Sequence, residues 1–276
     1  MLRKLVGRSP TLQLSETSSQ FEVPKAITGG AYIIIPMYNG ANTISNVLDR
    51  IPSFPALKGI IVVDDGSRDE SLRVVSAISH KKNLTITTHE TNRGYGGAQK
   101  TLMVKALELG ADYIILLHQD GQYPPEKVFL LYDLAQRNPD IDIILAPRVH
   151  MREGGMPLVK YVGNRALTAF QNFVLSARFS EYHTGMRLYT GKALKELHFT
   201  DYTDDYFFDT QIMAEAVAKG LTFGEVPIPT YYGSEVSQIR RILPYGVHCM
   251  LETVKSRITN RYITNTSRTK RLAAEP

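Results

Sequence analysis

The sequence has only one cysteine, Cys249, so an intrachain disulfide is excluded. A single thiol is consistent with a reducing compartment, and we expect Cys249 to fill space in the core rather than to act as a nucleophile. Long apolar runs are also absent: the longest, 32–36 and 113–117, are far below the roughly 18 residues of a membrane-spanning helix. The N-terminal end lacks the apolar stretch of a signal peptide. We therefore expect a polar leader over residues 1–30 and a cytoplasmic protein.

Acidic residues are scarce at the C-terminal end. Residues 255–276 contain one acid, Glu275, against six basic side chains, and the charges of the rest of the chain balance, so the net charge of +5 lies at this end. Such a basic segment predicts contact with phosphates or an anionic surface; a solvated tail is the alternative. Nucleic-acid binding is not expected, because the basic residues gather at one end and no recognised nucleic-acid module is present.

The body of the chain has the composition of a globular domain, with 43% hydrophobic and 21% charged residues. Short apolar runs that are typical of buried parallel strands alternate with segments of helical spacing. This alternation predicts an α/β fold with a mainly parallel sheet flanked by helices. The expected strands are 31–36, 59–63, 84–88, 113–117 and 222–226. The expected helices are 40–51, 70–79, 99–109, 159–175, 208–219 and an amphipathic helix over 239–258, with a loop at 181–187.

Polar or glycine-rich residues follow each of the first four predicted strands. They are Tyr38 with Asn39, Asp64 with Asp65, the segment 92–97, and the segment 118–122. In open parallel sheets, ligands bind beyond the carboxyl ends of the strands. The sequence therefore predicts one binding site built from four strand ends.

One of these segments has the ligands of a divalent cation. His118, Asp120 and Gln122 alternate, so they would point the same way in an extended stretch. Mg²⁺ prefers oxygen ligands, whereas Mn²⁺ tolerates imidazole, so His118 favours Mn²⁺. The alternative is a polar turn in which Asp120 caps the following segment and His118 packs against its neighbours. Spacing alone does not separate the two interpretations.

The second and third strand ends suit a nucleotide. Asp64 and Asp65 could accept hydrogen bonds from a base or a ribose, although an Asp-Gly turn that caps a helix is an equally ordinary interpretation. The glycines of segment 92–97 would let the backbone approach a ligand, and Arg93 or Lys100 could hold a phosphate. The segment is neither a Walker loop nor a dinucleotide fingerprint.

The ordered set of motifs is more specific than any one of them. It consists of Ile-Pro-x-Tyr-Asn at 35–39, Val-Asp-Asp-Gly-Ser at 63–67, Asn-Arg-Gly-x-Gly-Gly-Ala at 92–98 and Asp-Gly-Gln-Tyr-Pro-Pro-Glu at 120–126. Together these motifs resemble the inverting GT-A-fold glycosyltransferases of family 2. Within that family the sequence is most similar to the polyprenyl-phosphate sugar transferases typified by dolichol-phosphate mannose synthase. The likeness covers 31–235 and continues through Arg148, 185–189, 208–210 and 224–227.

The resemblance implies a metal-dependent enzyme that transfers a sugar, with inversion, from a UDP- or GDP-sugar to a polyprenyl-phosphate or saccharide acceptor. Mn²⁺ or Mg²⁺ would be the cofactor. The enzyme would act in glycan or cell-surface polysaccharide biosynthesis. Residues 31–147 would form the nucleotide-binding half and 148–235 the acceptor half. The C-terminal helix and basic tail, 236–276, would either meet the inner face of a membrane or pack on the domain and end in a solvated tail.

The resemblance also implies roles for single residues. The nucleotide and its phosphates would be lined by Pro36, Tyr38, Asn39, Asp64, Asp65, Arg93, Gly94, Lys100 and Gln119. Donor or acceptor phosphate would be bound by Arg148, Arg165 and Arg187. The metal would be held by Asp120, with help from Gln122 and from His118, which stands where the family usually has an aspartate. Candidate bases are Asp204, Asp205, Asp209 and His183, so the expected catalytic residues are Asp120, Arg187, Asp205 as the first choice of base, and Asp209.

Two departures from the family pattern keep another function open. His118 replaces an acid, and Gly40 replaces the acid that frequently follows Tyr-Asn. A degenerate transferase that serves as a nucleotide-sugar sensor or partner subunit would tolerate both changes. A sugar-phosphate nucleotidyltransferase is not expected, because residues 38–40 do not supply the glycine-rich basic loop that it needs. The sugar, the acceptor and a homo-oligomeric state are left open.

Overall fold

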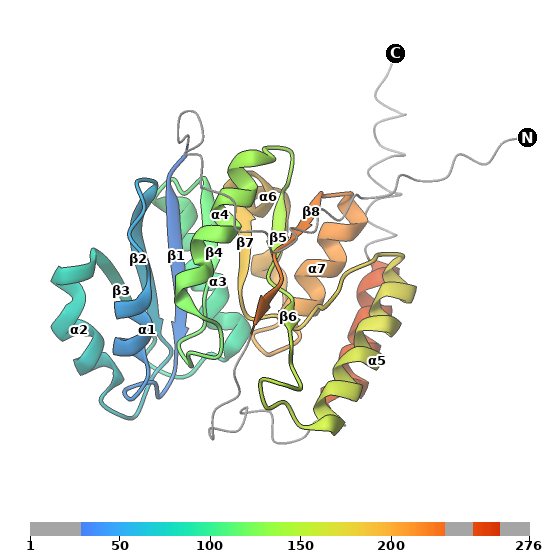
Figure 1. The fold of residues 1–276 in the computed structure, drawn as a ribbon, viewed down its shortest axis with the longest axis horizontal. Helices are drawn as coiled ribbons and strands as arrows, with labels where there is room; N and C mark the ends of the chain where they lie inside the picture. Colours follow the sequence, from blue (N-terminus) through green and yellow to red (C-terminus); the bar gives the residue numbers. More distant parts are fainter. Residues whose placement is uncertain (1–28, 230–244, 260–276) are drawn as a thin grey trace, which may run out of the picture.

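The computed structural model describes residues 29–229 and 245–259, which form a central sheet covered by helices on both faces (Figure 1). The sheet has seven strands in the order β3-β2-β1-β4-β7-β5-β8. All neighbouring strands run parallel except β7, which is antiparallel to both β4 and β5. The strands are β1 (Ala31–Met37), β2 (Leu57–Asp64), β3 (Leu84–Thr88), β4 (Tyr113–Leu116), β5 (Ile143–Leu145), β7 (Arg187–Thr190) and β8 (Phe223–Glu225). The predicted mainly parallel α/β fold is confirmed.

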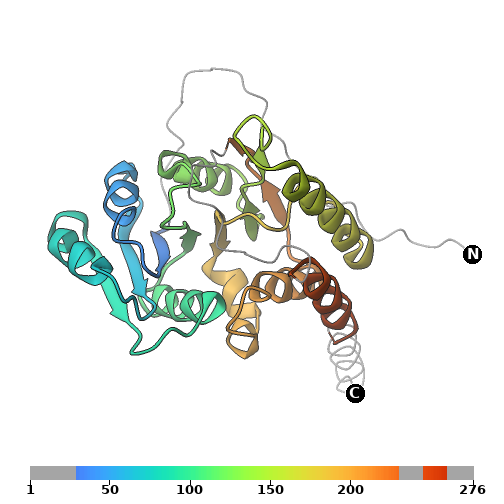
Figure 2. The same ribbon diagram turned by 90° about the horizontal axis from the view of Figure 1, so that it is seen from below.

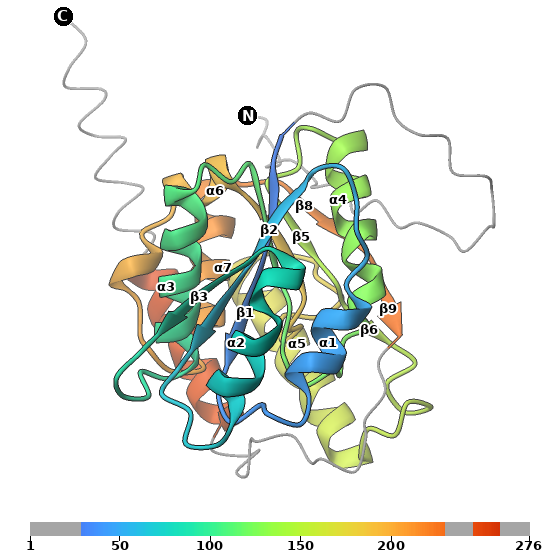
Figure 3. The ribbon, with the colours of Figure 1, turned by 90° about the vertical axis from the view of Figure 1, so that its left-hand side faces the viewer.

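Helices cover the two faces of the sheet, as the edge-on view shows (Figure 3). They are α1 (Ile44–Arg50), α2 (Ser71–Lys82), α3 (Tyr95–Glu108), α4 (Val128–Arg137), α5 (Leu158–Leu175), α6 (Gly191–Glu196) and α7 (Phe208–Lys219). Two 3₁₀ turns, η1 (Pro125–Lys127) and η2 (Phe199–Asp201), precede α4 and follow α6. A separate two-stranded sheet pairs β6 (Arg148–Val149) with β9 (Ile228–Pro229).

Strand β1 separates two hydrophobic cores. Ile33, Ile34 and Ile35 are all fully buried, and successive side chains of a strand point to opposite faces. Ile33 and Ile35 accordingly join the core under α1 and α4, whereas Ile34 joins the core under α3 and α7. The continuous apolar run of this strand is thus explained by burial on both faces.

Several elements differ from the sequence-based expectation. The predicted 181–187 loop ends where β7 begins, and β7 lies between β4 and β5 in the sheet. The helices α4 and α6 and the strand β5 were not foreseen. Helix α3 begins at Tyr95, four residues before the predicted start, because the glycine-rich segment forms its first turn.

A helix over 245–259 lies beside α5 (Figures 1 and 2). Gln171 of α5 donates a side-chain hydrogen bond to Thr253 Oγ1 of this helix at 3.3 Å. Cys249 is buried, as expected of a core residue. Within the described residues, no helix has the length and apolar character needed to cross a bilayer. Nearly all of the predicted leader, residues 239–244 of the predicted C-terminal helix and the tail beyond 259 lie outside the described residues.

Candidate active site

A cavity of about 1140 Å³ lies at the carboxyl edge of the parallel strands. Its wall also includes residues from α5, from segment 203–209 and from the start of the 245–259 helix. Many of the residues that the sequence singled out share this wall: Pro36, Tyr38, Asp65, Arg93, Gly94, His118, Gln119, Asp120, Gln122, Arg148, His183, Asp204, Asp205 and Asp209. The strand ends therefore do converge on one site, as the rule for open sheets predicts.

Asn39 and Asp64 lie outside this wall, and their hydrogen bonds stabilise the loop that follows β2. The backbone N–H of Asn39 donates to Ser67 Oγ at 2.9 Å, and its side-chain oxygen accepts from the N–H of Arg68 at 2.9 Å. Asp64 is buried and accepts from the N–H of Ser67 at 3.4 Å. These contacts are those of an Asp-Gly turn, the alternative interpretation of this motif.

Asp65 reaches the cavity but is occupied by hydrogen bonds within the protein. Its two carboxylate oxygens accept from the backbone N–H groups of Arg93 at 2.8 Å and Gly94 at 2.9 Å. His89 Nδ1 lies 2.6 Å from the same carboxylate, and His89 Nε2 lies 2.9 Å from Thr101 Oγ1. Asp65 thus fixes the loop that carries Arg93. His89 was not predicted as a site residue, although it directly follows the third strand.

The glycines at the start of α3 allow close contact with segment 203–204. The carbonyl oxygen of Asp204 accepts from the N–H groups of Gly96 at 2.8 Å and Gly97 at 3.2 Å. A Cβ on Gly96 would lie 2.5 Å from the carbonyl oxygen of Thr203. Lys100, predicted to hold phosphate, instead forms an ion pair with Asp204 and a 2.7 Å hydrogen bond to the carbonyl of Tyr202. The close backbone approach that glycine permits is therefore made to segment 203–204.

Asp120 and Gln122 lie in a tight turn rather than in the extended stretch that the sequence suggested. The N–H of Gln122 donates to Asp120 Oδ1 at 3.0 Å, and Gly121 has a φ of 70°. Asp120 is exposed to the cavity. His118 is more enclosed: its Nε2 is 3.3 Å from the hydroxyl of Tyr95, and burial lowers its pKa. In the described part of the chain, no three His, Cys, Asp or Glu side chains form a metal-binding group.

Arg187 lies under the cavity wall and holds Asp209. It is fully buried, and its guanidinium pairs with Asp209 at 2.6 Å and donates to the carbonyl of Tyr182 at 2.7 Å. Burial opposes the charge of Arg187, but Asp209 raises its pKa well above the ordinary value. The hydroxyl of Tyr95 donates to Asp209 at 2.9 Å. Because the guanidinium has no exposed surface, direct phosphate binding by Arg187 is not compatible with this arrangement.

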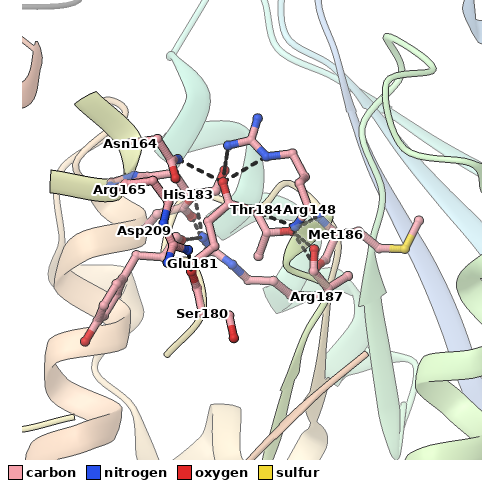
Figure 4. A network of polar contacts seen from close by, with 12 residues as sticks. Arg148, Asn164, Arg165, Ser180, Glu181, His183, Thr184, Met186, Arg187 and Asp209 are labelled. Carbon is pink, nitrogen blue, oxygen red and sulfur yellow. Dashed lines mark hydrogen bonds and ion pairs between the residues drawn. The ribbon is translucent and has the colours of Figure 1, made fainter. Parts of the chain in front are cut away.

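Arg148 lines the cavity and is held by Glu181 (Figure 4). Its Nε donates to Glu181 Oε1 at 2.8 Å, and its backbone N–H donates to Oε2 at 2.8 Å. Asn164 also donates to Glu181 at 2.9 Å. Burial favours the neutral form of Glu181, yet Arg148 lowers its pKa below the usual value. Arg165 is exposed, lies outside the cavity wall and bonds to the carbonyl of Ser180 at 3.3 Å.

The candidate bases differ in their surroundings. Both ring nitrogens of His183 have partners, Gln171 Oε1 at 3.0 Å and the hydroxyl of Tyr245 at 3.1 Å, and burial lowers its pKa to about 4. Asp204 is paired with Lys100. Asp205 is exposed at the cavity, and its carboxylate accepts a hydrogen bond from the nearby N–H of Phe207 at 2.7 Å.

Comparison of the sequence with family models identifies the fold and chemistry. The model described as "Glycosyl transferase family 2" matches residues 32–197, more than half of the chain. The chain belongs to this family. It is a glycosyltransferase, and the sheet has the GT-A arrangement that the resemblance implied.

Curated relatives of this glycosyltransferase include lipid-phosphate sugar transferases. The UDP-N-acetylglucosamine–dolichyl-phosphate N-acetylglucosaminyltransferase of Methanococcus voltae is 30% identical over 225 residues, which is 76% of this chain and 88% of that protein. The dolichyl-phosphate hexose transferase of Haloferax volcanii is 26% identical over 199 residues, 71% and 81% of the two chains. The similarity therefore extends over most of both relatives.

Solved structures support the fold. Glucosyl-3-phosphoglycerate synthase from Mycobacterium tuberculosis, in complex with phosphoglyceric acid, has a TM-score of 0.64 and 15% identity, covering 82% of this chain and 80% of that one. The same synthase with Mn²⁺, UDP and glucosyl-3-phosphoglycerate has a TM-score of 0.60 and 14% identity, with the same coverage. At this identity the likeness concerns the fold.

The departure of this glycosyltransferase at Gly40 has a steric explanation. Gln119 Nε2 donates to the carbonyl of Tyr38 at 3.0 Å, which turns the amide toward residue 40. A Cβ on Gly40 would lie 1.5 Å from Gln119 Oε1. Gln119 thus fills the space that a side chain at position 40 would need. Any residue other than glycine at position 40 would require Gln119 to move.

Proposed function

We propose that this glycosyltransferase moves a sugar, with inversion, from a UDP- or GDP-sugar to a polyprenyl phosphate at a membrane surface. The observation that carries the proposal is a cavity whose wall joins the strand-end residues to Arg148 and to helices with exposed apolar side chains. The printed activities of the Methanococcus and Haloferax relatives support a lipid-phosphate acceptor. A saccharide acceptor is the alternative.

Asp120 is the residue that would hold a divalent cation. Mg²⁺ and Mn²⁺ sites in phosphoryl-binding enzymes commonly use one or two carboxylates, with substrate phosphates and water as the other ligands. An exposed carboxylate in a turn with the Gln122 amide fits this requirement without a larger protein cluster. A bound Mn²⁺ or Mg²⁺ would stabilise the negative charge that develops on the diphosphate.

Arg148 would bind phosphate opposite the donor. Glu181 holds its guanidinium by a hydrogen bond, so the arginine is preorganised at the cavity and loses little freedom when a phosphate binds. The oxygen of an acceptor phosphate would form the new bond to the anomeric carbon. The bond from that carbon to the donor diphosphate would break, and the nucleoside diphosphate would leave with the electron pair. A phosphate acceptor is already anionic, so a base would be needed only for a hydroxyl acceptor, for which Asp205 is placed.

The exposed apolar side chains near the cavity support the membrane part of the proposal. Val159 and Val162 of α5 are 73% and 55% exposed, and Val247 and Leu251 of the neighbouring helix are 48% and 63% exposed. Val159 and Val247 also line the cavity, together with Lys160. Apolar side chains with nearby basic groups favour binding to an anionic bilayer. A lipid acceptor could then enter the cavity from the membrane.

Replacing Asp120 tests the function. Calorimetry of UDP and GDP with Mn²⁺ or Mg²⁺ should detect metal-dependent binding to the wild-type protein and its loss in Asp120→Asn. Asp201→Asn, an exposed acid of η2 outside the cavity wall, is the matched control and should bind as the wild type does. Nucleotide binding that is unchanged without a metal and unchanged in Asp120→Asn would contradict the proposal. Binding of a nucleotide sugar with neither transfer nor donor hydrolysis would favour the sensor.

A further inference from the structure

His118 precedes the Asp120 turn and lines the cavity, but its ring nitrogens face other protein groups. Nε2 is 3.3 Å from the hydroxyl oxygen of Tyr95, which donates its only hydrogen to Asp209 at 2.9 Å. The oxygen of Tyr95 can therefore only accept from His118, which places the imidazole hydrogen on Nε2. The Nε2 nitrogen is then a donor and has no lone pair for a cation.

The other ring nitrogen is covered by the backbone. A Cβ on Gly185 would lie 2.6 Å from both Nδ1 and Cε1 of His118, so this edge of the ring packs directly on residue 185. The ring also meets Tyr95 and Tyr123 edge to face, at centroid distances of 5.5 and 6.1 Å. These contacts hold the imidazole on three sides.

The residues tied to His118 come from different parts of the fold. Tyr95 begins α3, Asp209 lies in the first turn of α7, and Arg187 begins β7. Tyr95 also stacks on Tyr206, at 5.3 Å between centroids, in the segment that carries Asp205. The contacts from His118 through Tyr95 to Asp209 therefore connect the Asp120 turn with α3 and α7, and all of these residues line the cavity.

We propose that His118 is a positioning residue and not a metal ligand: it fixes Tyr95, and through Tyr95 the carboxylate of Asp209, at the wall of the cavity. The inference rests on the proposed transferase function, and it leaves Asp120 as the acid that meets the cation. Loss of His118 would free the Tyr95 hydroxyl to rotate away from Asp209 and would loosen the Tyr95–Tyr206 wall.

Pulsed EPR of Mn²⁺ tests the ligand assignment directly. The full chain, grown with ¹⁵N-histidine, is mixed with Mn²⁺ and whichever of UDP and GDP binds. We expect no hyperfine coupling from a histidine nitrogen. His118→Ala should bind the Mn²⁺–nucleotide within about twofold of wild type, since no ligand is lost. Asp120→Asn, measured in parallel, should lose metal-dependent binding.

Steady-state kinetics with a short-chain polyprenyl phosphate test the positioning role. His118→Ala should lower kcat about tenfold or more and change the donor KM little, since misplacement of groups at the reacting centre affects turnover. His118→Gln, whose amide can still donate to Tyr95, should recover much of kcat. Tyr95→Phe should show a similar loss, and adding His118→Ala to it should cost little more, because the two residues act as one unit.

The outcomes separate this inference from the proposed function. A histidine coupling that disappears in His118→Ala, or a loss of metal binding in that variant equal to that of Asp120→Asn, would overturn the positioning role alone. An unchanged kcat in His118→Ala would do the same. If the wild-type protein binds no metal–nucleotide pair at all, the proposed function fails and this inference fails with it.

Discussion

At the residue scale, the ion pair of Arg187 and Asp209 is a charged contact with very little access to solvent. The Arg187 side chain is fully buried and that of Asp209 is 12% exposed. A buried charge without its partner is strongly unfavourable, whereas removal of both charges can be nearly neutral. We expect Arg187→Met to lower the free energy of unfolding by about 3–5 kcal/mol. Urea denaturation checks this value.

The matched double variant separates charge from packing. Arg187→Met combined with Asp209→Asn removes both charges and should recover a large part of the lost stability. A loss below about 1 kcal/mol in Arg187→Met alone, as for an exposed pair, would show that Asp209 is solvated well enough without its partner.

His183 gives the protein a pH dependence in the acid range. Burial lowers its pKa to about 4, below the ordinary value of 6.5, so between these values the unfolded chain binds a proton that the folded protein does not. The free energy of unfolding should therefore fall as the pH drops from 6.5 towards 4, by at most about 3 kcal/mol from this group. The lowered pKa of His118 acts in the same direction.

Urea denaturation at pH 7 and pH 5 measures this effect. Both pH values lie above the ordinary pKa of most carboxylates, so few acidic groups titrate between them. His183→Gln, which keeps an amide between Gln171 and Tyr245, should lose less stability between the two pH values than the wild type loses. An unchanged loss in this variant would assign the pH dependence to other groups.

At the element scale, the first turn of α3 is closely packed on segment 203–208. Alanine at Gly96 would place its Cβ 2.5 Å from the carbonyl of Thr203 and 2.8 Å from Cβ of Phe208. We expect Gly96→Ala to lower the free energy of unfolding by about 1–3 kcal/mol, because backbone and a core residue would have to move. Thermal or urea denaturation provides the measurement.

Gly163 is the matched control for this helix glycine. It lies within α5, and no atom would come within 4 Å of an added Cβ. Gly163→Ala should stabilise the protein by roughly 0.5–1 kcal/mol through helix propensity alone. If Gly96→Ala were equally stabilising, the contact between α3 and segment 203–204 would be looser than its geometry implies.

The sheet strands that were not predicted, β5 and β7, are short and depend on their neighbours. β7 has only four residues, Arg187–Thr190, and begins with an arginine that a strand pattern does not favour. It becomes a strand because β4 and β5 pair with it on both sides and because Asp209 neutralises Arg187. Strand propensity is largely a matter of such tertiary context. The long apolar run of β1, in contrast, was predictable from its own residues.

At the scale of the whole molecule, the exposed apolar side chains near the cavity predict binding to bilayers. Sedimentation with anionic phospholipid vesicles should recover the wild-type protein. The triple variant Val159→Ser, Val162→Ser and Leu251→Ser should bind at least about tenfold more weakly, because each substitution removes apolar surface that the lipid would bury.

Two exposed apolar residues elsewhere provide the control for this experiment. Leu72 of α2 and Val104 of α3 are 40% and 37% exposed and lie outside the cavity wall. Leu72→Ser with Val104→Ser should leave vesicle binding unchanged. Equal losses in the two variants, or no binding by the wild type, would contradict a membrane face beside the cavity.

The α/β fold, the family and the position of a cavity at the strand ends could all be predicted from the order of residues along the chain. Apolar runs and helical spacing are local properties, and parallel strands bring their carboxyl ends to one edge whatever the loops do. Polar residues such as Tyr38, Asp65 and Asp120 could thus be assigned to one site from their positions along the chain. The order of the motifs then connected that site with glycosyl transfer.

Which polar side chains face the cavity and which stabilise its wall depends on how the chain is folded. Asp65 accepts from the Arg93 loop, Lys100 pairs with Asp204, and Arg187 is buried against Asp209. The partners in each pair are far apart in the sequence and come together only when the sheet and its loops are assembled. A hydrogen bond or ion pair is satisfied by whichever group the fold places within reach, and spacing along the chain does not contain that information.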